Sequence, residues 1–287
     1  MPGQDGAQTR RGYLFHDVAD IYDQARPKYP EQLFTDLVHW IPITASSRIL
    51  EIGCGTGIAT QSLAAWGCPV AALDPGEEMV AVARRRLQHA HHVEFHVSTF
   101  EEYCSRAEGQ FTAVIAATSY HWLDPDMRER AVWNLLHPSG AIAIFRHWGR
   151  VGGDVEFYTG VQEIYRSLAP ELLEEAIRAA AGDPSAVSFG HVVPLTDEAI
   201  AAHTDRLEHA ELWKEMEYVT YPWEQVYTGE EYVNLLSTYS DHLLLAPDVR
   251  ERLIAAIRTF IDTSRSGHVR KAYATALRRA RKRFPTG

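Results

Sequence analysis

Apolar runs of strand length alternate with helical stretches across the first half of the chain. The runs lie at residues 48–52, 70–74, 93–97, 111–117 and 141–147. Because alternating strands and helices imply right-handed crossovers, this pattern predicts a parallel sheet with helices on its faces. The run at 111–117 is almost continuously apolar, which is typical of a strand that is buried on both faces. This part of the chain therefore predicts an α/β fold.

The second half of the chain has a different pattern. Residues 150–210 contain more helix-like sequence than a crossover needs, so we interpret them as a helical lid inserted after the fifth strand. Thr228 and Glu231 have the spacing of a capping box, which predicts the start of another helix. The elements predicted here are helices at 155–168, 171–181, 196–209 and 247–263, and strands at 213–227 and 269–280.

Four segments follow from these patterns. Residues 1–45 contain a polar N-terminal tail and cap helices, and residues 46–148 form the nucleotide-binding core of a Rossmann-like fold. Residues 149–212 form the lid insertion, and residues 213–287 supply the strands and helices that complete a sheet of seven strands.

The turn after the first strand contains three glycines, Gly53, Gly55 and Gly57. Glycine lets the backbone approach a ligand closely, because no Cβ intervenes. Dinucleotide-binding folds need G-x-G-x-x-G, which places a pyrophosphate on the helix N-terminus. The spacing here differs, and acidic Glu51 lies two residues before the first glycine. This argues against an NAD-dependent oxidoreductase, while a tight strand–helix turn without a ligand remains the alternative.

The second apolar run ends in an acid, Asp74, which lies 19 positions after Gly55. In nucleotide-binding folds an acid at about this spacing binds the ribose hydroxyls. One carboxylate can accept both hydrogen bonds of a vicinal diol. The structural alternative is a helix N-cap or Asx turn before Pro75 and Gly76, and both roles can hold.

A polar string, Thr118-Ser119-Tyr120-His121-Trp122, follows the fourth strand, at the edge where α/β proteins bind ligands. His121 is the best candidate for a general base, since an ordinary imidazole pKa of about 6.5 suits proton transfer at pH 7. The alternative is a histidine that orients a neighbour or packs against a cofactor. Trp122 either covers a ligand pocket or is a core aromatic residue.

Taken in order, these motifs resemble those of the class I S-adenosylmethionine (SAM) methyltransferases. The E-x-G-x-G-x-G turn is similar to that family's first motif. The S-x-H-W-x-D string at 119–124 and the segment 15–30 resemble a small-molecule subgroup that includes trans-aconitate methyltransferase-like proteins. The resemblance is strong over 13–148, weaker over 213–283 and absent over about 150–210. It implies a mostly parallel sheet of order 3-2-1-4-5-7-6, with SAM as methyl donor and S-adenosylhomocysteine as product.

The resemblance also implies roles for single residues. Glu51 accepts hydrogen bonds near the SAM amino group, and Tyr22 closes near the methyl group. Arg26 lies near the methionine carboxylate, with a surface ion pair as the alternative. Thr99 stands where Asp is common in the family, so Phe100 and its backbone N–H are the expected adenine contacts. The full set of expected cofactor-binding residues is Glu51, Gly53, Gly55, Gly57, Asp74, Pro75, Thr99, Phe100, Thr118 and Arg26. The expected catalytic residues are His121 and Tyr22, and the expected substrate contacts are Trp122, His147 and Trp148.

Composition narrows the partners and the compartment. A net charge of −10 argues against nucleic acid as the main partner, and the basic run at 278–283 is interpreted as a solvated face. Three cysteines at unrelated spacing indicate no disulfide framework. Since no leader-like or membrane-spanning run is visible, we expect a cytoplasmic protein with no membrane partner. His89, His91 and His92 lack other ligands at suitable spacing, so no metal is expected.

The leading hypothesis is methyl transfer from SAM to a small molecule, with an aromatic or carboxylic metabolite as the acceptor. A nucleic-acid methyltransferase is one alternative, but the Asn/Asp-Pro-Pro-aromatic string of such enzymes is missing after the fourth strand. A non-catalytic SAM-binding protein is another. The polar string Tyr239-Ser240-Asp241-His242 is a further candidate for the site. The acceptor atom (O, N or C) and the oligomeric state are not readable from the sequence.

Overall fold

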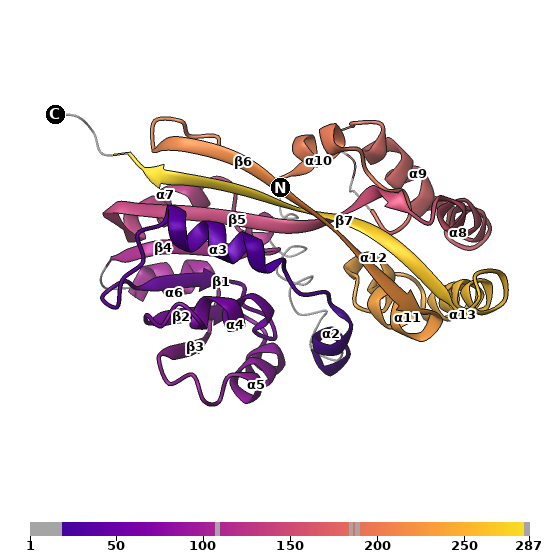
Figure 1. Cartoon of the computed structure of the whole chain (residues 1–287), viewed down its shortest axis with the longest axis horizontal. Helices are drawn as coiled ribbons and strands as arrows, with labels where there is room; N and C mark the ends of the chain where they lie inside the picture. Colours follow the sequence, from indigo (N-terminus) through magenta and orange to yellow (C-terminus); the bar gives the residue numbers. More distant parts are fainter. Residues whose placement is uncertain (1–18, 107–109, 184–185, 187–189, 284–287) are drawn as a thin grey trace, which may run out of the picture.

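A sheet of seven strands runs through the molecule (Figure 1). The computed structural model describes residues 19–106, 110–183, 186 and 190–283. The strands are β1 (Ile49–Ile52), β2 (Val70–Asp74), β3 (Val93–Val97), β4 (Phe111–Ala117), β5 (Leu136–Gly153), β6 (Trp213–Thr228) and β7 (His268–Lys282). Their order is β3-β2-β1-β4-β5-β7-β6, with β1 to β5 parallel and β7 antiparallel to both of its neighbours. The predicted Rossmann-like fold and strand order are therefore confirmed.

Most helices also lie where the sequence predicts them. They are α2 (Ala19–Ala25), α3 (Glu31–Trp40), α4 (Ile58–Ala64), α5 (Glu77–Arg86), α6 (Phe100–Arg106), the 3-10 turn η2 (Tyr120–Trp122), α7 (Arg128–Leu135), α8 (Val155–Leu168), α9 (Pro170–Ala180), α10 (Asp197–His203), α11 (Gly229–Leu236), α12 (Ser240–Leu243) and α13 (Pro247–Ser264). The capping box at the start of α11 is present in both directions. The expected tail at 1–12 and residues 15–18 of the N-terminal motif lie outside the described residues.

One predicted helix is too long. The sequence predicts a helix to residue 209, whereas α10 ends at His203. Thr204 has an extended backbone, and its hydroxyl donates to the carbonyl of Ile200 at 2.7 Å. This side-chain hydrogen bond competes with continuation of the helix.

Alternate side chains of the central strands enter two cores, one on each face of the sheet. Leu50 and Val114 pack in a buried cluster with residues of α6 and α7. Ile49 and Ile115 pack on the other face with residues of α3 and α4. Because side chains alternate along a strand, Glu51 lies on the same face as Ile49, and it is fully buried. A buried acid in the middle of a central strand needs a separate explanation.

A third core lies at the far end of the long strands. β5, β6 and β7 contain 18, 16 and 15 residues, and they extend well beyond β4 (Figure 1). There, residues of α8 and α9 pack with residues of α11 and α13 in one buried cluster, which we call the distal core. The predicted lid at 149–212 therefore does not pack alone, because the distal core also includes helices from the C-terminal segment.

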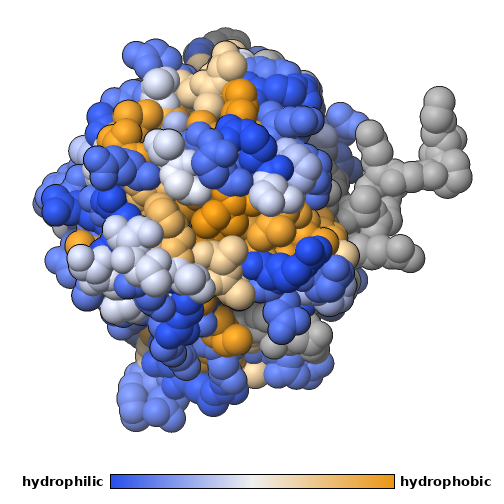
Figure 2. Space-filling model, turned by 90° about the vertical axis from the view of Figure 1, so that its right-hand side faces the viewer, coloured by the Kyte–Doolittle hydropathy of each residue, from blue (hydrophilic) through white to orange (hydrophobic). Residues whose placement is uncertain are grey.

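The outer face of this end is mixed in polarity. Figure 2 shows hydrophobic residues gathered in the middle of the face, with hydrophilic residues around them. Within the described part of the chain, no helix has both the length and the apolar character needed to cross a bilayer. The basic run at 278–283 belongs to the end of β7, where Arg279 pairs with Glu217 and Arg281 with Glu215 of β6. These arginines thus serve strand pairing rather than forming a free basic patch.

Candidate functional site

The glycine turn connects β1 to α4 and contacts the segment that follows β4. Gly53 has a φ of +70°, and a Cβ added there would lie 2.4 Å from Cβ of Ser119. The Ser119 hydroxyl donates to the carbonyl of Ile52. Gly57 has a φ of +83° at the N-cap of α4. Both positions therefore need glycine for the turn itself, and the turn brings bare backbone to the carboxyl edge of the sheet. Their role in binding a cofactor stays a prediction.

Asp74 fixes the position of this turn. Its Oδ2 accepts a hydrogen bond from the Gly55 N–H at 2.9 Å, and its Oδ1 accepts one from the Gly76 N–H at 2.8 Å. The second bond is the Asx turn that the sequence offered as an alternative, while the N-cap of α5 is Gly76. Burial raises the pKa of Asp74, partly offset by these two bonds. Each carboxylate oxygen keeps a second lone pair, so a ribose contact remains compatible with this arrangement.

Glu51 lies on β1, two residues before the glycine turn, and is 0% exposed. Neither of its carboxylate oxygens has a hydrogen-bond partner among the residues that the structure describes. Burial, opposed by the nearby Thr60 hydroxyl and reinforced by Asp74, raises the pKa of Glu51 to about 7. An unpartnered buried carboxylate costs free energy, and a cationic donor above it would offset that cost. The ammonium group of SAM is such a donor, so Glu51 fits its predicted role.

The expected adenine contacts are placed differently. Thr99 and Glu102 exchange hydrogen bonds at the start of α6, with the Thr99 hydroxyl accepting from the Glu102 N–H at 3.2 Å. The Phe100 side chain is 3% exposed and packs in the core with Leu50. The ring is therefore part of the core, and an adenine contact by Phe100 or its backbone N–H stays a prediction. Pro75 is partly exposed directly after Asp74.

A cavity of about 170 Å³ lies between α2, η2, β5, β7 and α12. Thr118, which lines it, directly precedes Ser119, the residue that Gly53 of the glycine turn contacts. Seven of the residues predicted from sequence line it: Tyr22, Arg26, Thr118, His121, Trp122, His147 and Trp148. The structure thus brings the expected catalytic and substrate-contacting residues together. Thr118 has a φ of +58°, which is uncommon for a residue with a side chain and recurs at functional sites.

Arg26 joins the N-terminal helix α2 to the distal core. Its guanidinium donates to the Thr238 hydroxyl at 2.9 Å and to the Thr238 carbonyl at 2.7 Å. It also lies between the rings of Tyr22 and Tyr239, at 4.8 and 4.4 Å from their centroids. The surface ion pair that was the alternative for Arg26 is absent from the described residues. A contact with a methionine carboxylate stays a prediction.

His121 stands in η2, directly after β4, and its ring lies 4.8 Å from that of Trp122. Its Nδ1 is buried without a hydrogen-bond partner among the described residues. Burial and the cations Arg146 and Arg128 hold the pKa of His121 well below its usual range. The imidazole is therefore neutral at pH 7, which is the form that accepts a proton, but it is a weaker base than the sequence suggested.

His147 and Trp148 lie in β5 just beyond Phe145, the last residue that pairs with β4. The ring of Tyr29 stacks on His147 at 4.2 Å, and His147 Nδ1 lies 2.9 Å from the Thr275 hydroxyl. Burial and nearby Arg26 lower the pKa of His147 to about 3. Trp148 is 5% exposed and packs with Leu195, so it is mainly a core residue with part of its surface on the cavity.

Sequence reasoning missed several residues of the cavity wall. These are Arg146, Gly149, Gly190, His191, Lys271 and Tyr273, whereas Tyr239, Ser240 and Asp241 come from the polar string that was a candidate. Lys271 is 0% exposed, its Nζ donates to the Tyr232 hydroxyl at 3.4 Å, and burial lowers its pKa to about 7. A lysine in an antiparallel strand gives no local signal that it points inward, so burial alone identifies it.

The segment that contains the glycine turn is similar to known methyltransferases. Residues 49–140 match a family model described as a methyltransferase domain. An uncharacterized methyltransferase of Mycobacterium tuberculosis is 31% identical over 130 residues, which is 45% of this chain and 50% of that protein. A ubiquinone biosynthesis O-methyltransferase of Xanthomonas axonopodis is 35% identical over 100 residues, which is 34% of this chain and 42% of that protein. The chain thus spans about half the length of the curated relatives it matches.

A solved structure shares the fold. An Anaeromyxobacter dehalogenans protein described as a candidate type II methyltransferase superposes with a TM-score of 0.57 at 22% identity, over 89% of this chain and 97% of the other. At this identity the likeness concerns the fold alone. Together with the family match and the strand order, it supports a class I SAM methyltransferase fold.

Proposed function

We propose that this chain is a SAM-dependent methyltransferase whose acceptor is a small molecule bound in the cavity next to the glycine turn. The observation that carries the proposal is Glu51, a fully buried carboxylate whose oxygens have no hydrogen-bond partner among the described residues. It lies two residues before a turn of bare backbone. A phosphate-binding turn would not place a carboxylate there, because like charges repel. A nucleoside that carries an ammonium group would instead be attracted to the Glu51 carboxylate.

The residues present divide the cofactor between them. Glu51 would accept from the SAM ammonium group, and Asp74, already fixed by two backbone N–H groups, would accept from the ribose hydroxyls. Tyr22 and Thr118 both line the cavity. Bound SAM would supply a methyl group activated by its sulfonium, so the protein mainly has to align an acceptor and exclude water.

The cavity favours a small acceptor with both an acidic and an unsaturated part. Its volume of about 170 Å³ is modest, and the sequence lacks a free basic surface for a polymer. The guanidinium of Arg146 lies 4.4 Å over the Trp148 ring, and no carboxylate of the described residues forms a salt bridge with it. Buried cations beside aromatic rings would bind a carboxylate attached to a flat apolar group. The resemblance to the trans-aconitate methyltransferase-like subgroup supports the same acceptor class.

Proton transfer depends on the acceptor atom. A hydroxyl or amine must lose a proton, and we assign the role of base to neutral His121, which lines the cavity. A carboxylate oxygen needs no base. The relative named as a ubiquinone biosynthesis O-methyltransferase supports testing hydroxyl acceptors as well.

The experiment uses SAM labelled on its methyl group, incubated with the protein and separate pools of carboxylic acids, phenols, amines, nucleic acid and protein. Label in a small-molecule pool, lost in a Glu51→Gln variant, is the expected result. Label only in nucleic acid or protein would overturn the acceptor assignment. Absence of label in every pool, with SAM still bound, would favour a non-catalytic SAM-binding protein.

His121→Gln then tests the base. We expect turnover with a hydroxyl or amine acceptor to fall by about a hundredfold or more, because general-base catalysis typically contributes that much. SAM affinity, measured separately by calorimetry, should change little. Undiminished turnover with such an acceptor would remove His121 from the role of base.

A further inference from the structure

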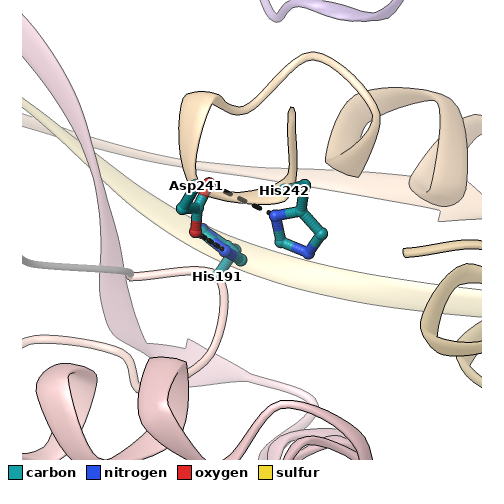
Figure 3. Close-up of side chains that lie close together, drawn as sticks. All are labelled: His191, Asp241 and His242. Atoms are coloured by element: carbon teal, nitrogen blue, oxygen red, sulfur yellow. Dashed lines mark hydrogen bonds and ion pairs between the residues drawn. The ribbon is translucent and has the colours of Figure 1, made fainter. Parts of the chain in front are cut away.

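Three side chains of types that can bind a metal ion lie close together at the wall of the cavity. His191 comes from the segment after α9, and Asp241 and His242 come from α12. Figure 3 shows the carboxylate of Asp241 between the two imidazole rings. We propose that His191, Asp241 and His242 form a binding site for one divalent transition-metal ion, with an open coordination position that faces the cavity. This proposal does not depend on the methyl-transfer reaction.

The distances are close to those of a metal site. Nε2 of His191 lies 2.9 Å from Oδ2 of Asp241, and Nδ1 of His242 lies 3.2 Å from Oδ1. One donor atom from each residue lies within 4.8 Å of the others. Ligands about 2.1 Å from a tetrahedral ion lie about 3.4 Å apart, so the widest pair would close by up to about 1.5 Å. Side-chain rotation can supply such a contraction.

The surroundings hold both imidazoles in place. Nε2 of His242 shares a hydrogen bond with the Tyr165 hydroxyl at 2.7 Å, which leaves Nδ1 directed at Asp241. The ring of Tyr239 stacks on His191 at 4.4 Å with an interplanar angle of 15°. Metal-ligating histidines commonly have their second nitrogen hydrogen-bonded, as Nε2 of His242 is here, and such partners tune the affinity of the site. The histidine pair is therefore oriented from outside as well as from Asp241.

Burial and access together distinguish this cluster from a surface group of acids. The three residues are buried, with His191 6% and His242 0% exposed. His191 and Asp241 nevertheless line the cavity, so an ion there could take a further ligand from water or from a bound molecule. A network that only stabilised the fold would have no need to border the cavity. Two imidazoles and one carboxylate suit Zn²⁺, Co²⁺, Mn²⁺ or Fe²⁺ rather than Mg²⁺ or Ca²⁺.

The experiment titrates the metal-free, full-length protein with Zn²⁺ in a calorimeter, and with Co²⁺ while the visible spectrum is recorded. We expect one ion per chain and a Co²⁺ spectrum typical of nitrogen ligands at low coordination number. Asp241→Asn and His242→Gln should each weaken binding by at least about a hundredfold, and Tyr165→Phe by about tenfold. His91→Gln, at an exposed histidine outside the cluster, is the matched control and should bind the ion as the unchanged protein does.

Two results would overturn the proposal. One is a dissociation constant for Zn²⁺ above the millimolar range, and the other is an equal loss of Zn²⁺ affinity in His91→Gln and Asp241→Asn. If the cluster variants do not fold, X-ray absorption of the Zn²⁺-loaded original protein decides the matter, because two imidazoles must contribute to the first coordination sphere. A first coordination sphere without imidazoles would show that the cluster is only a hydrogen-bonded network. SAM affinity is measured in parallel, so failure of the metal site and failure of the proposed reaction give different results.

Discussion

Glu51→Gln tests the link between burial and cofactor binding. In the protein without SAM, burial raises the pKa of Glu51 from 4.5 to about 7. At about 1.4 kcal/mol for each tenfold change, ionised Glu51 costs the folded state about 3 kcal/mol. Because the folded pKa of this acid is raised, the cost is absent below pH 4.5, grows as the pH rises through 7 and is complete above it. The amide of Gln does not ionise and does not carry this cost.

Urea denaturation measures this part of the argument. At each pH, the free energy of unfolding of the unchanged protein is subtracted from that of Glu51→Gln. This difference should be about 3 kcal/mol larger at pH 8 than at pH 4.5. A conservative control is Glu102→Gln, which alters an exposed acid at the start of α6. An equal difference at both values of pH would show that Glu51 does not ionise with a raised pKa.

SAM binding should respond in the opposite direction. Pairing with an ammonium group favours ionised Glu51, so binding at pH 6 should release close to one proton. Affinity should then rise by up to tenfold for each pH unit toward 7. Glu51→Gln should weaken binding at pH 7.5 by about 10- to 150-fold, the loss expected for a hydrogen bond between charged groups. Calorimetry in two buffers with different ionisation enthalpies counts the protons. Equal affinity and no proton release in either protein would refute the ammonium assignment.

Three further substitutions test the frame of the site. Gly53→Ala should lower the free energy of unfolding by about 3 kcal/mol or more, because the new Cβ would meet Ser119. Gly67 has a similar φ of +74° but open space around it, so Gly67→Ala should lower the free energy of unfolding by only about 1 kcal/mol. Urea denaturation compares the two, and equal losses would contradict the steric argument. Asp74→Ala should raise the SAM dissociation constant at least about tenfold, and unchanged affinity by calorimetry would exclude the ribose contact. Glu129→Gln, at an acid that accepts three hydrogen bonds from the chain at the start of β6, should lower the thermal midpoint by several degrees, and an unchanged midpoint would show that these bonds contribute little.

The residues that the sequence singled out are mostly those of local units, and the residues that it missed are brought in by contacts between distant segments. The glycine turn, Asp74 and the string after β4 lie within short, local strand–turn–helix units, where spacing alone places a residue at the carboxyl edge. Lys271 and His191 reach the cavity only because β7 is long and the segment after α9 returns to it. Such contacts join residues far apart in the chain, and no periodicity in a single sequence reports them.

The two adenine predictions show a different limit. The resemblance implied that Thr99 and Phe100 lie beside the cofactor, and both residues follow β3 as expected. Their side chains, however, serve the start of α6 and the core. Position along a strand predicts which edge a residue reaches. The direction of its side chain depends on competing local partners, here Glu102.

Helix α2 contacts both α5, on the side of the glycine turn, and α11 of the distal core. On one side Asp23 forms a salt bridge with Arg86 of α5 at 2.5 Å, next to the glycine turn. On the other side Arg26 donates two hydrogen bonds to Thr238, at the end of α11. Tyr22, directly before Asp23 in the same helix, lines the cavity. The short helix α2 therefore carries one wall residue of the cavity and is held from both sides, by Arg86 and by Thr238.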